Sequence, residues 1–122
     1  MIRGIRGAIT VTEDNEQQIL QATNKLLKEM IKKNNIQPEN VAQVLITVTE
    51  DLISTFPAKA LRNLEGWTFV PVMCMQEIPV AGSLQMCIRV MMTVNTEIKQ
   101  NKINHVYLEG ATVLRPDLSV PS

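Results

Sequence analysis

Apolar residues along this chain recur with two spacings, one typical of β-strands and the other typical of an α-helix. Segments of strand length that are rich in apolar and β-branched residues cover 1–11, 41–49, 67–74, 87–94 and 105–110. Several of them are apolar at consecutive positions, which is typical of strands buried on both faces. Pro71 lies in the third segment and favours an edge position or a bulge for that strand. The pattern therefore predicts a sheet of about five strands.

The segment after the first strand has helical spacing instead. Asp14 and Gln17 have the spacing of a capping box, and the apolar positions that follow recur every three or four residues up to about Lys33. A second, short helix is predicted in FPAKALRNLEG, with Pro57 at its start and Gly66 as its C-cap. Only the first of these helices is long enough to cover much of a sheet.

One long helix can cover only one face of the predicted sheet. The other face is left apolar and bare, because several strands are apolar on both sides. A bare apolar face of this kind must find a partner. We therefore expect an oligomer in which subunits bury this face of the sheet against each other.

Length and composition exclude several classes of protein. At 122 residues the chain is expected to form one domain, 1–122. Twelve basic residues balance twelve acidic ones and aromatic residues make up only 3%, so nucleic-acid binding is disfavoured. Met1 is followed directly by IRGIRGAIT, without the apolar core of a signal peptide. No apolar stretch approaches the length needed to span a membrane.

Cysteine and histidine usage indicates neither a disulfide nor a metal site. Cys74 and Cys87 each lie inside an apolar stretch and lack CxxC spacing, so reduced thiols in a cytoplasmic protein are expected. His105 is the only histidine, and with two scattered thiols it does not make a metal site. We expect a cytoplasmic protein without a bound metal.

An arginine interrupts the apolar run CIRVMMTV. A guanidinium stays charged and is costly to bury unpaired, so Arg89 requires a negative partner. Strand alternation places Arg89 on one face with Cys87, Met91 and Thr93. An ion pair with a glutamate, either buried or at a subunit interface, is the simplest explanation.

Other cations lie at unusual positions. Arg6 lies in the apolar, glycine-flanked first strand. Lys59 and Arg62 lie on one face of the short helix, near its start, where cations oppose the helix dipole and free N–H groups favour an anion. Arg115 lies in the LRPD of the tail, where a solvated surface charge is an equally good explanation. Together with Arg89, these residues suggest a pocket for a small polyanion, in particular a dicarboxylate.

Groups able to act as a nucleophile or a base are scarce. Cys74 has no nearby histidine to activate it and is better explained as a pocket wall. Glu77 is the one carboxylate in its run, and it is either the partner of an arginine or a solvated acid at a strand end. Tyr107 either presents its hydroxyl to the cavity or packs against its neighbours. The residues thus predict an anion pocket rich in fixed donors, with one carboxylate and no nucleophile–base pair.

Five blocks of sequence carry a resemblance to a known family: RGIRGA, FPAKALR, CMQE, GSLQMCIRVMMTV and HVYLEGATVLRPDLS. They follow one another in order from near the start of the chain to near its end, and jointly they are very specific. On these blocks the chain resembles the AroH-type monofunctional chorismate mutases. The resemblance implies an α+β fold, with a mixed β-sheet and helices packed on one face. It also implies a homotrimer around a pseudo-α/β barrel, with active sites in the clefts between subunits.

The resemblance implies a reaction as well. This is the Claisen rearrangement of chorismate to prephenate, a step toward phenylalanine and tyrosine. The reaction is pericyclic and needs neither a cofactor nor a covalent intermediate. Chorismate is a dicarboxylate, in agreement with the predicted cationic pocket.

The matching motifs also imply the roles of individual residues. Arg89 would face the breaking ether oxygen, and Glu77 would accept from the ring hydroxyl near the electron-poor ring. Arg6 would bind the substrate, and Tyr107 would contact a carboxylate. The adjoining subunit would contribute Phe56, Ala58, Lys59 and Arg62. The pocket walls and a mobile C-terminal tail, 115–122, would include Val72, Met73, Cys74, Leu114 and Arg115.

Two other functions stay open on the residues. One is an imine or enamine deaminase of the related trimeric fold, which also holds a carboxylate with a strand arginine. That enzyme does not require Glu77, Lys59 and Arg115 together. The other is a non-catalytic module that binds small anions between subunits. One residue departs from the mutase pattern, because Met73 stands where a smaller polar residue is expected before CMQE.

Overall fold

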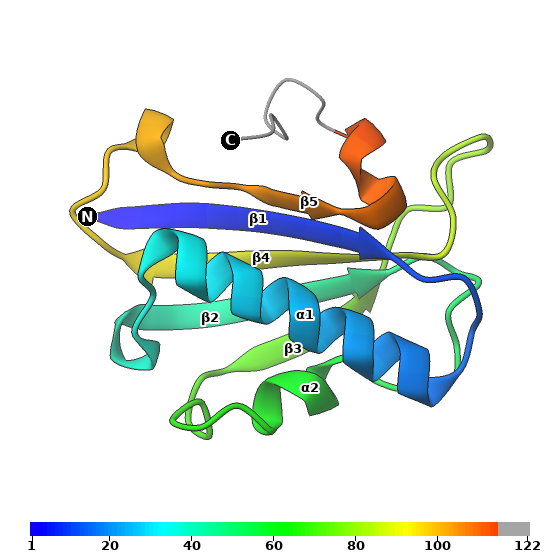
Figure 1. Cartoon of the computed structure of the whole chain (residues 1–122), viewed down its shortest axis with the longest axis horizontal. Helices are drawn as coiled ribbons and strands as arrows, with labels where there is room; N and C mark the ends of the chain where they lie inside the picture. Colours follow the sequence, from blue (N-terminus) through cyan, green and yellow to red (C-terminus); the bar gives the residue numbers. More distant parts are fainter. Residues whose placement is uncertain (115–122) are drawn as a thin grey trace.

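A computed structural model of the chain describes residues 1–114, in which five strands form one sheet (Figure 1). The strands are β1 (Ile2–Thr10), β2 (Val41–Val48), β3 (Val72–Gln76), β4 (Cys87–Asn95) and β5 (Val106–Leu108). Their order across the sheet is β3-β2-β4-β1-β5. β4 is antiparallel to β1 and β2, whereas the edge strands β5 and β3 run parallel to β1 and β2, respectively. The sheet is therefore mixed, as predicted, and the strand that follows Pro71 lies at its edge.

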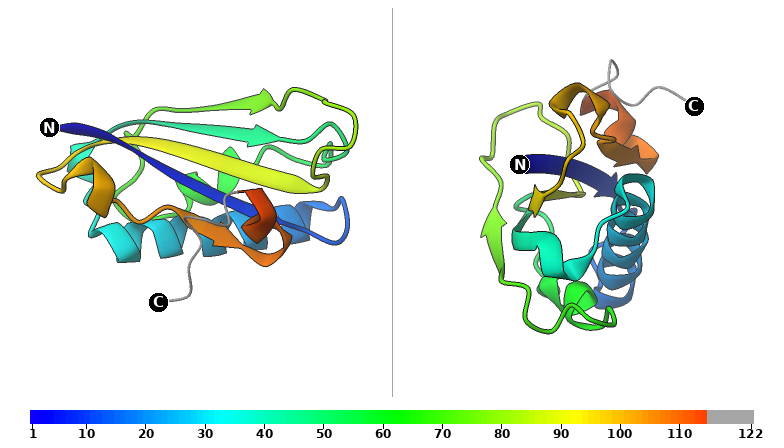
Figure 2. Two further views of the ribbon diagram at one scale, coloured as in Figure 1. Left: turned by 90° about the horizontal axis from the view of Figure 1, so that it is seen from above. Right: turned by 90° about the vertical axis from the view of Figure 1, so that its left-hand side faces the viewer.

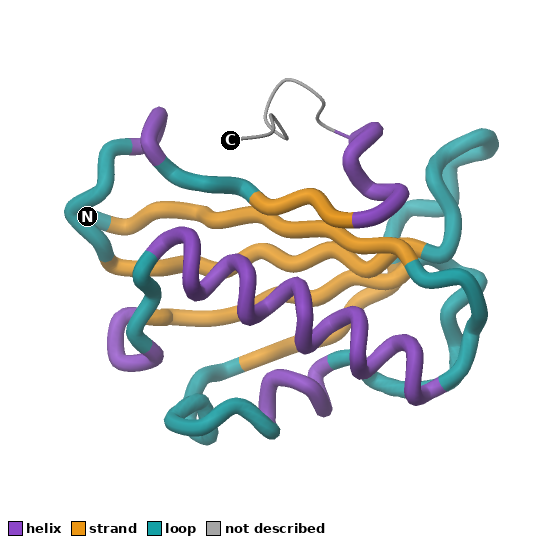
Figure 3. The backbone as a smooth tube through the Cα atoms, in the orientation of Figure 1, coloured by secondary structure: helices purple, strands orange, loops and turns teal. Residues whose placement is uncertain are grey.

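Two α-helices lie on the same face of the sheet (Figure 2). They are α1 (Glu16–Asn34) and α2 (Ala58–Arg62). Short 3₁₀ helices join or follow the strands: η1 (Pro38–Asn40), η2 (Gln100–Lys102) and η3 (Glu109–Leu114). Figure 3 shows α1 running along the sheet with the strands behind it. No helix within residues 1–114 is long and apolar enough to cross a membrane.

The start of α1 lies one residue later than the capping-box spacing predicts. Asn15 is the N-cap, and its side-chain oxygen accepts a hydrogen bond from the N–H of Gln18 at 2.8 Å. Asp14 instead accepts from the backbone N–H groups of Ile53 and Ser54 at 3.0 and 3.1 Å. Its carboxylate therefore ties the start of the helix to the loop before α2, a distant contact that local spacing does not indicate.

The helix α2 is shorter than predicted. It ends at Arg62 with Asn63 as its C-cap, and Gly66 lies in the turn beyond with a φ of 86°. Gly66 is therefore not the C-cap, although its positive φ explains why glycine is favoured there. In a helix this short, Lys59 and Arg62 both lie in the last turn, where the dipole favours cations. The prediction that the cations oppose the helix dipole is therefore wrong for Arg62, whereas Lys59, the second residue of the helix, lies in its first turn as well.

The main core lies between the sheet and α1. Alternate residues of the central strands point into it, and the apolar face of α1 meets them. Fully buried side chains in this core include Ile5, Ile9, Ile19, Leu26, Leu27, Met30, Val44, Ile46, Ile88 and Met92. Gly7 allows α1 to approach β1 closely, because a Cβ there would collide with the side chain of Met30. Arg6, the residue before Gly7, points to the opposite side of β1, away from α1, and lines a pocket there.

The opposite face of the sheet has neither α1 nor α2 over it (Figure 2). Met73, Met75 and Met91 lie on this side with 64%, 40% and 36% of their surface exposed. At one end η3 covers a small buried cluster of Ala8, Cys87, Tyr107 and Ala111. The predicted bare face is thus present in the single chain. The strand β4, expected to be buried on both faces, is exposed there at Met91.

Candidate active site

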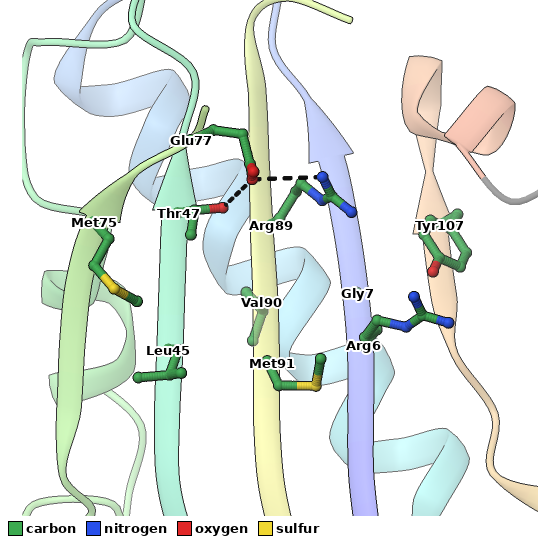
Figure 4. Close-up of a pocket in the computed structure, with 10 residues that line it drawn as sticks. All are labelled: Arg6, Gly7, Leu45, Thr47, Met75, Glu77, Arg89, Val90, Met91 and Tyr107. Carbon is green, nitrogen blue, oxygen red and sulfur yellow. Dashed lines mark hydrogen bonds and ion pairs between the residues drawn. The ribbon is translucent and has the colours of Figure 1, made fainter. Parts of the chain in front are cut away.

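A pocket of about 280 Å³ opens on the uncovered face of the sheet (Figure 4). Its lining residues come from all five strands or their ends: Arg6, Gly7, Leu45, Thr47, Met75, Glu77, Arg89, Val90, Met91 and Tyr107. Four of these residues are ones that the sequence predicts for catalysis or substrate binding: Arg6, Glu77, Arg89 and Tyr107. The fold therefore brings together four predicted site residues from distant parts of the chain.

Arg89 lies on the central strand β4. In the sheet register it is opposite Thr47 of β2 on one side and Ala8 of β1 on the other, and these small side chains leave room for its long stem. Its Nη1 lies 3.5 Å from Oε2 of Glu77, and the two side chains are 40% and 28% exposed. Glu77 is thus the negative partner that the apolar run around Arg89 requires.

Glu77 approaches Arg89 from just beyond the edge strand β3. Its backbone N–H donates to the carbonyl oxygen of Val48 at 2.8 Å, which extends the pairing between β3 and β2. Its side chain then meets Thr47, whose hydroxyl donates to Oε2 at 2.8 Å (Figure 4). The same carboxylate oxygen therefore accepts the Thr47 hydrogen bond and faces Arg89.

Arg6 and Tyr107 lie on the other side of Arg89, on β1 and β5 (Figure 4). Tyr107 is opposite Ala8 in the parallel register, and its hydroxyl is buried without a hydrogen-bond partner among residues 1–114. A buried hydroxyl in this state costs free energy, so a ligand that bonds to it relieves that cost. With the two guanidinium groups, this hydroxyl offers a set of donors to a ligand that carries negative charge.

His105 supports this side of the pocket, although the sequence analysis considered it only as a metal ligand or as a base for Cys74, and favoured neither role. The backbone N–H of Arg6 donates to its Nδ1 at 3.0 Å. Strand alternation gives no signal for this contact, because His105 precedes β5 and its ring bonds to the backbone of β1. Thr47 gives no signal either, because a single threonine in an apolar strand is common and carries no chemistry by itself.

The FPAKALR residues lie away from this pocket. The Nζ of Lys59 lies 3.0 Å from Oε2 of Glu16, and this hydrogen bond, followed by one from Thr55, lowers the pKa of Glu16. Lys59 and Phe56 line a second cavity, of about 580 Å³, together with Cys74. Within one chain, the Arg89 pocket is not lined by Phe56, Ala58, Lys59 or Arg62.

The other predicted wall residues are divided between the two faces of the sheet. Val72 and Cys74 are partly buried against the main core, on the side of the helices. Met73 lies between them in the strand and is exposed on the uncovered face. Leu114 packs against the small cluster around Tyr107. Arg115 and the rest of the predicted tail, 115–122, lie outside the described residues.

Thiol chemistry is disfavoured at this site. Cys87 lies on the same face as Arg89, and burial raises the pKa of its thiol from 9.0 to about 11, although the Arg89 charge acts in the opposite direction. Near neutral pH this group is therefore a protonated thiol and a poor nucleophile. In the described part of the chain, no three His, Cys, Asp or Glu side chains are grouped so that they could hold a metal ion. Among the described residues, the pocket is lined by two guanidinium groups, one carboxylate and the Tyr107 hydroxyl, which has no hydrogen-bond partner there.

Comparison with known proteins shows which family the chain belongs to. The family model described as chorismate mutase type I matches residues 2–118. The chain belongs to this family. It is 58% identical to the chorismate mutase AroH of Bacillus subtilis (strain 168) over 120 residues, which are 98% of this chain and 94% of that protein. It is 52% identical to the chorismate mutase AroH of Thermus thermophilus over 119 residues, which are 97% of each chain.

A solved chorismate mutase from Clostridium thermocellum has the same fold. The TM-score is 0.87 at 51% sequence identity, over 90% of this chain and 97% of the other. The predicted family, the α+β fold with its mixed sheet and the chorismate mutase function, an isomerase activity, are therefore confirmed. Membership of the chorismate mutase family favours this function over the deaminase and the anion-binding module. The roles of the individual residues stay predictions.

Proposed function

We propose that the chorismate mutase reaction takes place in the Arg89–Glu77 pocket, where chorismate rearranges to prephenate. One observation carries this proposal: a guanidinium and a carboxylate lie 3.5 Å apart on an open sheet face, in a pocket also lined by Arg6 and Tyr107. The rearrangement breaks an ether C–O bond and forms a C–C bond within one molecule, so it needs no co-reactant. Fixed charges without a nucleophile suit such a reaction.

Arg89 stabilises the ether oxygen in the transition state. The C–O bond stretches ahead of C–C bond formation, so the oxygen becomes partly negative and the ring fragment partly positive. Arg89 extends from a central strand and needs little rearrangement to meet this charge, which is the condition for strong electrostatic stabilisation. Partial burial strengthens the attraction. Glu77 accepts a hydrogen bond from the ring hydroxyl and favours the positive fragment.

Arg6 and Tyr107 bind the carboxylates of the substrate. A guanidinium fits a carboxylate with two parallel hydrogen bonds, and the buried hydroxyl of Tyr107 gains a partner when the carboxylate binds. Holding both carboxylates selects the compact conformer of chorismate, in which the reacting carbons lie close together. The site thus combines electrostatic with conformational catalysis and forms no covalent intermediate.

The active protein is a homotrimer with its clefts between subunits. Two features support this part of the proposal: the exposed methionines of the uncovered face, and the distance of the FPAKALR residues from the pocket of their own chain. The neighbouring subunit would complete each cleft with Phe56, Ala58, Lys59 and Arg62. The walls and the end of the chain would add Val72, Met73, Cys74, Leu114 and Arg115.

Incubation of the purified protein with chorismate tests the proposal. The absorbance of chorismate should fall while an equal amount of prephenate accumulates. The Arg89→Ala variant, purified in the same way, should lose most of this activity and controls for a contaminating mutase. Unchanged chorismate would contradict the reaction, whereas an alanine variant as active as the wild type would contradict the site.

The product indicates where the reaction belongs in metabolism. Prephenate is a precursor of phenylalanine and tyrosine, so the reaction belongs to aromatic amino acid biosynthesis. We propose a cytoplasmic location, which stays a prediction of the sequence. Assay of the separated cell fractions for mutase activity would test it.

A further inference from the structure

Thr47 lies between the two charged residues of the pocket. It is opposite Arg89 in the antiparallel register of β2 with β4, and opposite Met75 in the parallel register of β2 with β3. Its hydroxyl donates to Oε2 of Glu77 at 2.8 Å (Figure 4). The Nη1 of Arg89 lies farther from the same oxygen, at 3.5 Å. The short contact of the Glu77 carboxylate is therefore with the neutral hydroxyl and not with the guanidinium.

We propose that Thr47 is a positioning residue of the active site, which holds the Glu77 carboxylate beside Arg89 but short of a close contact with it. This inference rests on the roles proposed above for Glu77 and Arg89. Thr47 acts through Glu77, by fixing where its carboxylate lies, and takes no part in the bonds that break and form.

The starting point of the Glu77 side chain explains why such a contact is needed. Glu77 lies just beyond the edge strand β3, and its carboxylate must extend past β2 to approach Arg89 on β4. A glutamate side chain has several rotatable bonds, and fixing them costs conformational entropy. Thr47 is β-branched, so its χ1 is restricted and the direction of its hydroxyl is well defined. A stiff donor thus holds a flexible acceptor in place.

The Thr47 hydrogen bond also keeps both charged groups available to the substrate. A guanidinium and a carboxylate that approach freely form a close pair, often bidentate, at about 2.7–2.9 Å. Such a pair would occupy the N–H groups that Arg89 offers to the ether oxygen, and both oxygens of Glu77. In the structure the Thr47 and Arg89 contacts both fall on Oε2. Among the contacts of residues 1–114, this leaves Oε1 to accept a hydrogen bond from the ring hydroxyl.

Two substitutions at position 47 form a matched test. Thr47→Val keeps the shape of the side chain and suits a strand, but it removes the hydroxyl. Thr47→Ser keeps the hydroxyl and removes only a methyl group. We expect Thr47→Val to lower kcat about tenfold, the scale of one hydrogen bond to a charged group, with a smaller change in KM. The serine variant keeps the hydroxyl but loses the restricted χ1, so its kcat should lie between those of the wild type and Thr47→Val. Both variants should melt close to the wild-type temperature.

A double-mutant cycle with Glu77→Ala shows whether Thr47 acts through Glu77. In the Glu77→Ala background, adding Thr47→Val should not lower kcat further, because the acceptor of the hydrogen bond is gone. A structural readout is independent of activity. In a crystal structure of the Thr47→Val protein, the Glu77 carboxylate should lie about 2.8 Å from the Arg89 guanidinium.

Three results would overturn the inference. They are a wild-type kcat for Thr47→Val, an undiminished effect of that change in the Glu77→Ala background, and an unmoved Glu77 carboxylate in the crystal structure. The proposed function fails in a different way. If Glu77→Ala alone keeps the wild-type kcat, the role of Glu77 is wrong and the inference falls with it. A slow Glu77→Ala protein beside a normal Thr47→Val protein overturns the inference alone.

Discussion

The imidazole of His105 takes the place of a backbone acceptor beside β1, because its Nδ1 accepts the N–H of Arg6 at 3.0 Å. A backbone N–H can only donate, so Nδ1 carries no proton in this contact. The regular pairing of β5 with β1 begins one residue later. Before it, the backbone of Asn104 bonds to the side chain of Asn34 on α1, at 2.8 and 2.9 Å. His105 thus links Arg6 to the strand that carries the hydroxyl of the pocket.

Replacement of His105 by leucine should weaken substrate binding more than it slows the chemical step. The backbone of Arg6 would lose its acceptor, and the guanidinium proposed to bind the substrate would move with the strand. The KM for chorismate should rise about fivefold, the scale of one neutral hydrogen bond, while kcat changes less. His105→Asn is the matched control in steady-state kinetics, because its amide oxygen can accept the same N–H. An unchanged KM in the leucine variant would show that His105 does not position Arg6.

Loss of the charge at Arg89 should stop the chemistry while the protein still folds. Removal of one preorganised donor from an active site costs about 10²–10³ in rate, so Arg89→Ala should lower kcat by at least that factor. Citrulline at this position has nearly the shape of arginine but no charge, and it should lower kcat far more than it weakens binding. Single-turnover measurements separate these two effects. Normal turnover by the citrulline protein would leave Arg89 as an ion-pair partner of Glu77 and nothing more.

The proposed clefts between subunits predict that two inactive variants restore each other's activity when they are mixed. Arg6→Ala removes a group from one side of each cleft and Arg62→Ala removes one from the other, so each variant alone should have little activity. In trimers reassembled at random from equal amounts of both, roughly a quarter of the clefts combine the two intact arginines. The activity of the mixture should therefore rise toward a quarter of the wild-type value. A mixture no more active than its parts, or a fully active monomer in light scattering, would exclude shared clefts.

The faces of the strands could be predicted because strand alternation is a local property. Arg89 and Met91 share the uncovered face, as the alternation in CIRVMMTV indicates. The bare face itself follows from one long helix and about five apolar strands. Both predictions depend only on neighbouring positions in the chain and on the need to bury apolar surface.

Contacts between distant segments could not be predicted in this way. The hydrogen bond from Thr47 to Glu77 spans 30 residues of sequence, and that from Arg6 to His105 spans 99. The direction of Cys74 was out of reach for another reason. The strand VMCMQ has apolar residues on both faces, so alternation cannot tell which face Cys74 shares. The pairing of β3 with β2 decides it: within one chain, Cys74 packs toward the helices and lines the cavity of Phe56 and Lys59, not the Arg89 pocket.

The raised pKa of the Cys87 thiol predicts that the fold loses stability at alkaline pH. In the folded chain burial raises the pKa of its thiol from 9.0 to about 11. Between these values the unfolded chain has lost the thiol proton and the folded protein retains it, so unfolding releases a proton and becomes more favourable as the pH rises. The stabilisation is fully present below pH 9 and is lost as the pH rises through 11. Through Cys87 alone, the free energy of unfolding should be about 1 kcal/mol lower at pH 10 than at pH 8.

Urea unfolding measures this effect at one fixed protein concentration, because the proposed association of subunits would make stability depend on concentration. Lysine and tyrosine side chains also titrate in this range, so the thiol is isolated by comparison with Cys87→Ala. That variant should be less stable throughout because of lost packing, yet its decline from pH 8 to pH 10 should be smaller by about 1 kcal/mol. Ile88→Val is the matched control, because it also loosens the core but keeps the thiol, so its decline should equal that of the wild type. Equal declines for Cys87→Ala and the wild type would mean that the thiol ionises as freely in the folded protein as in the unfolded chain, and would contradict a pKa raised by burial.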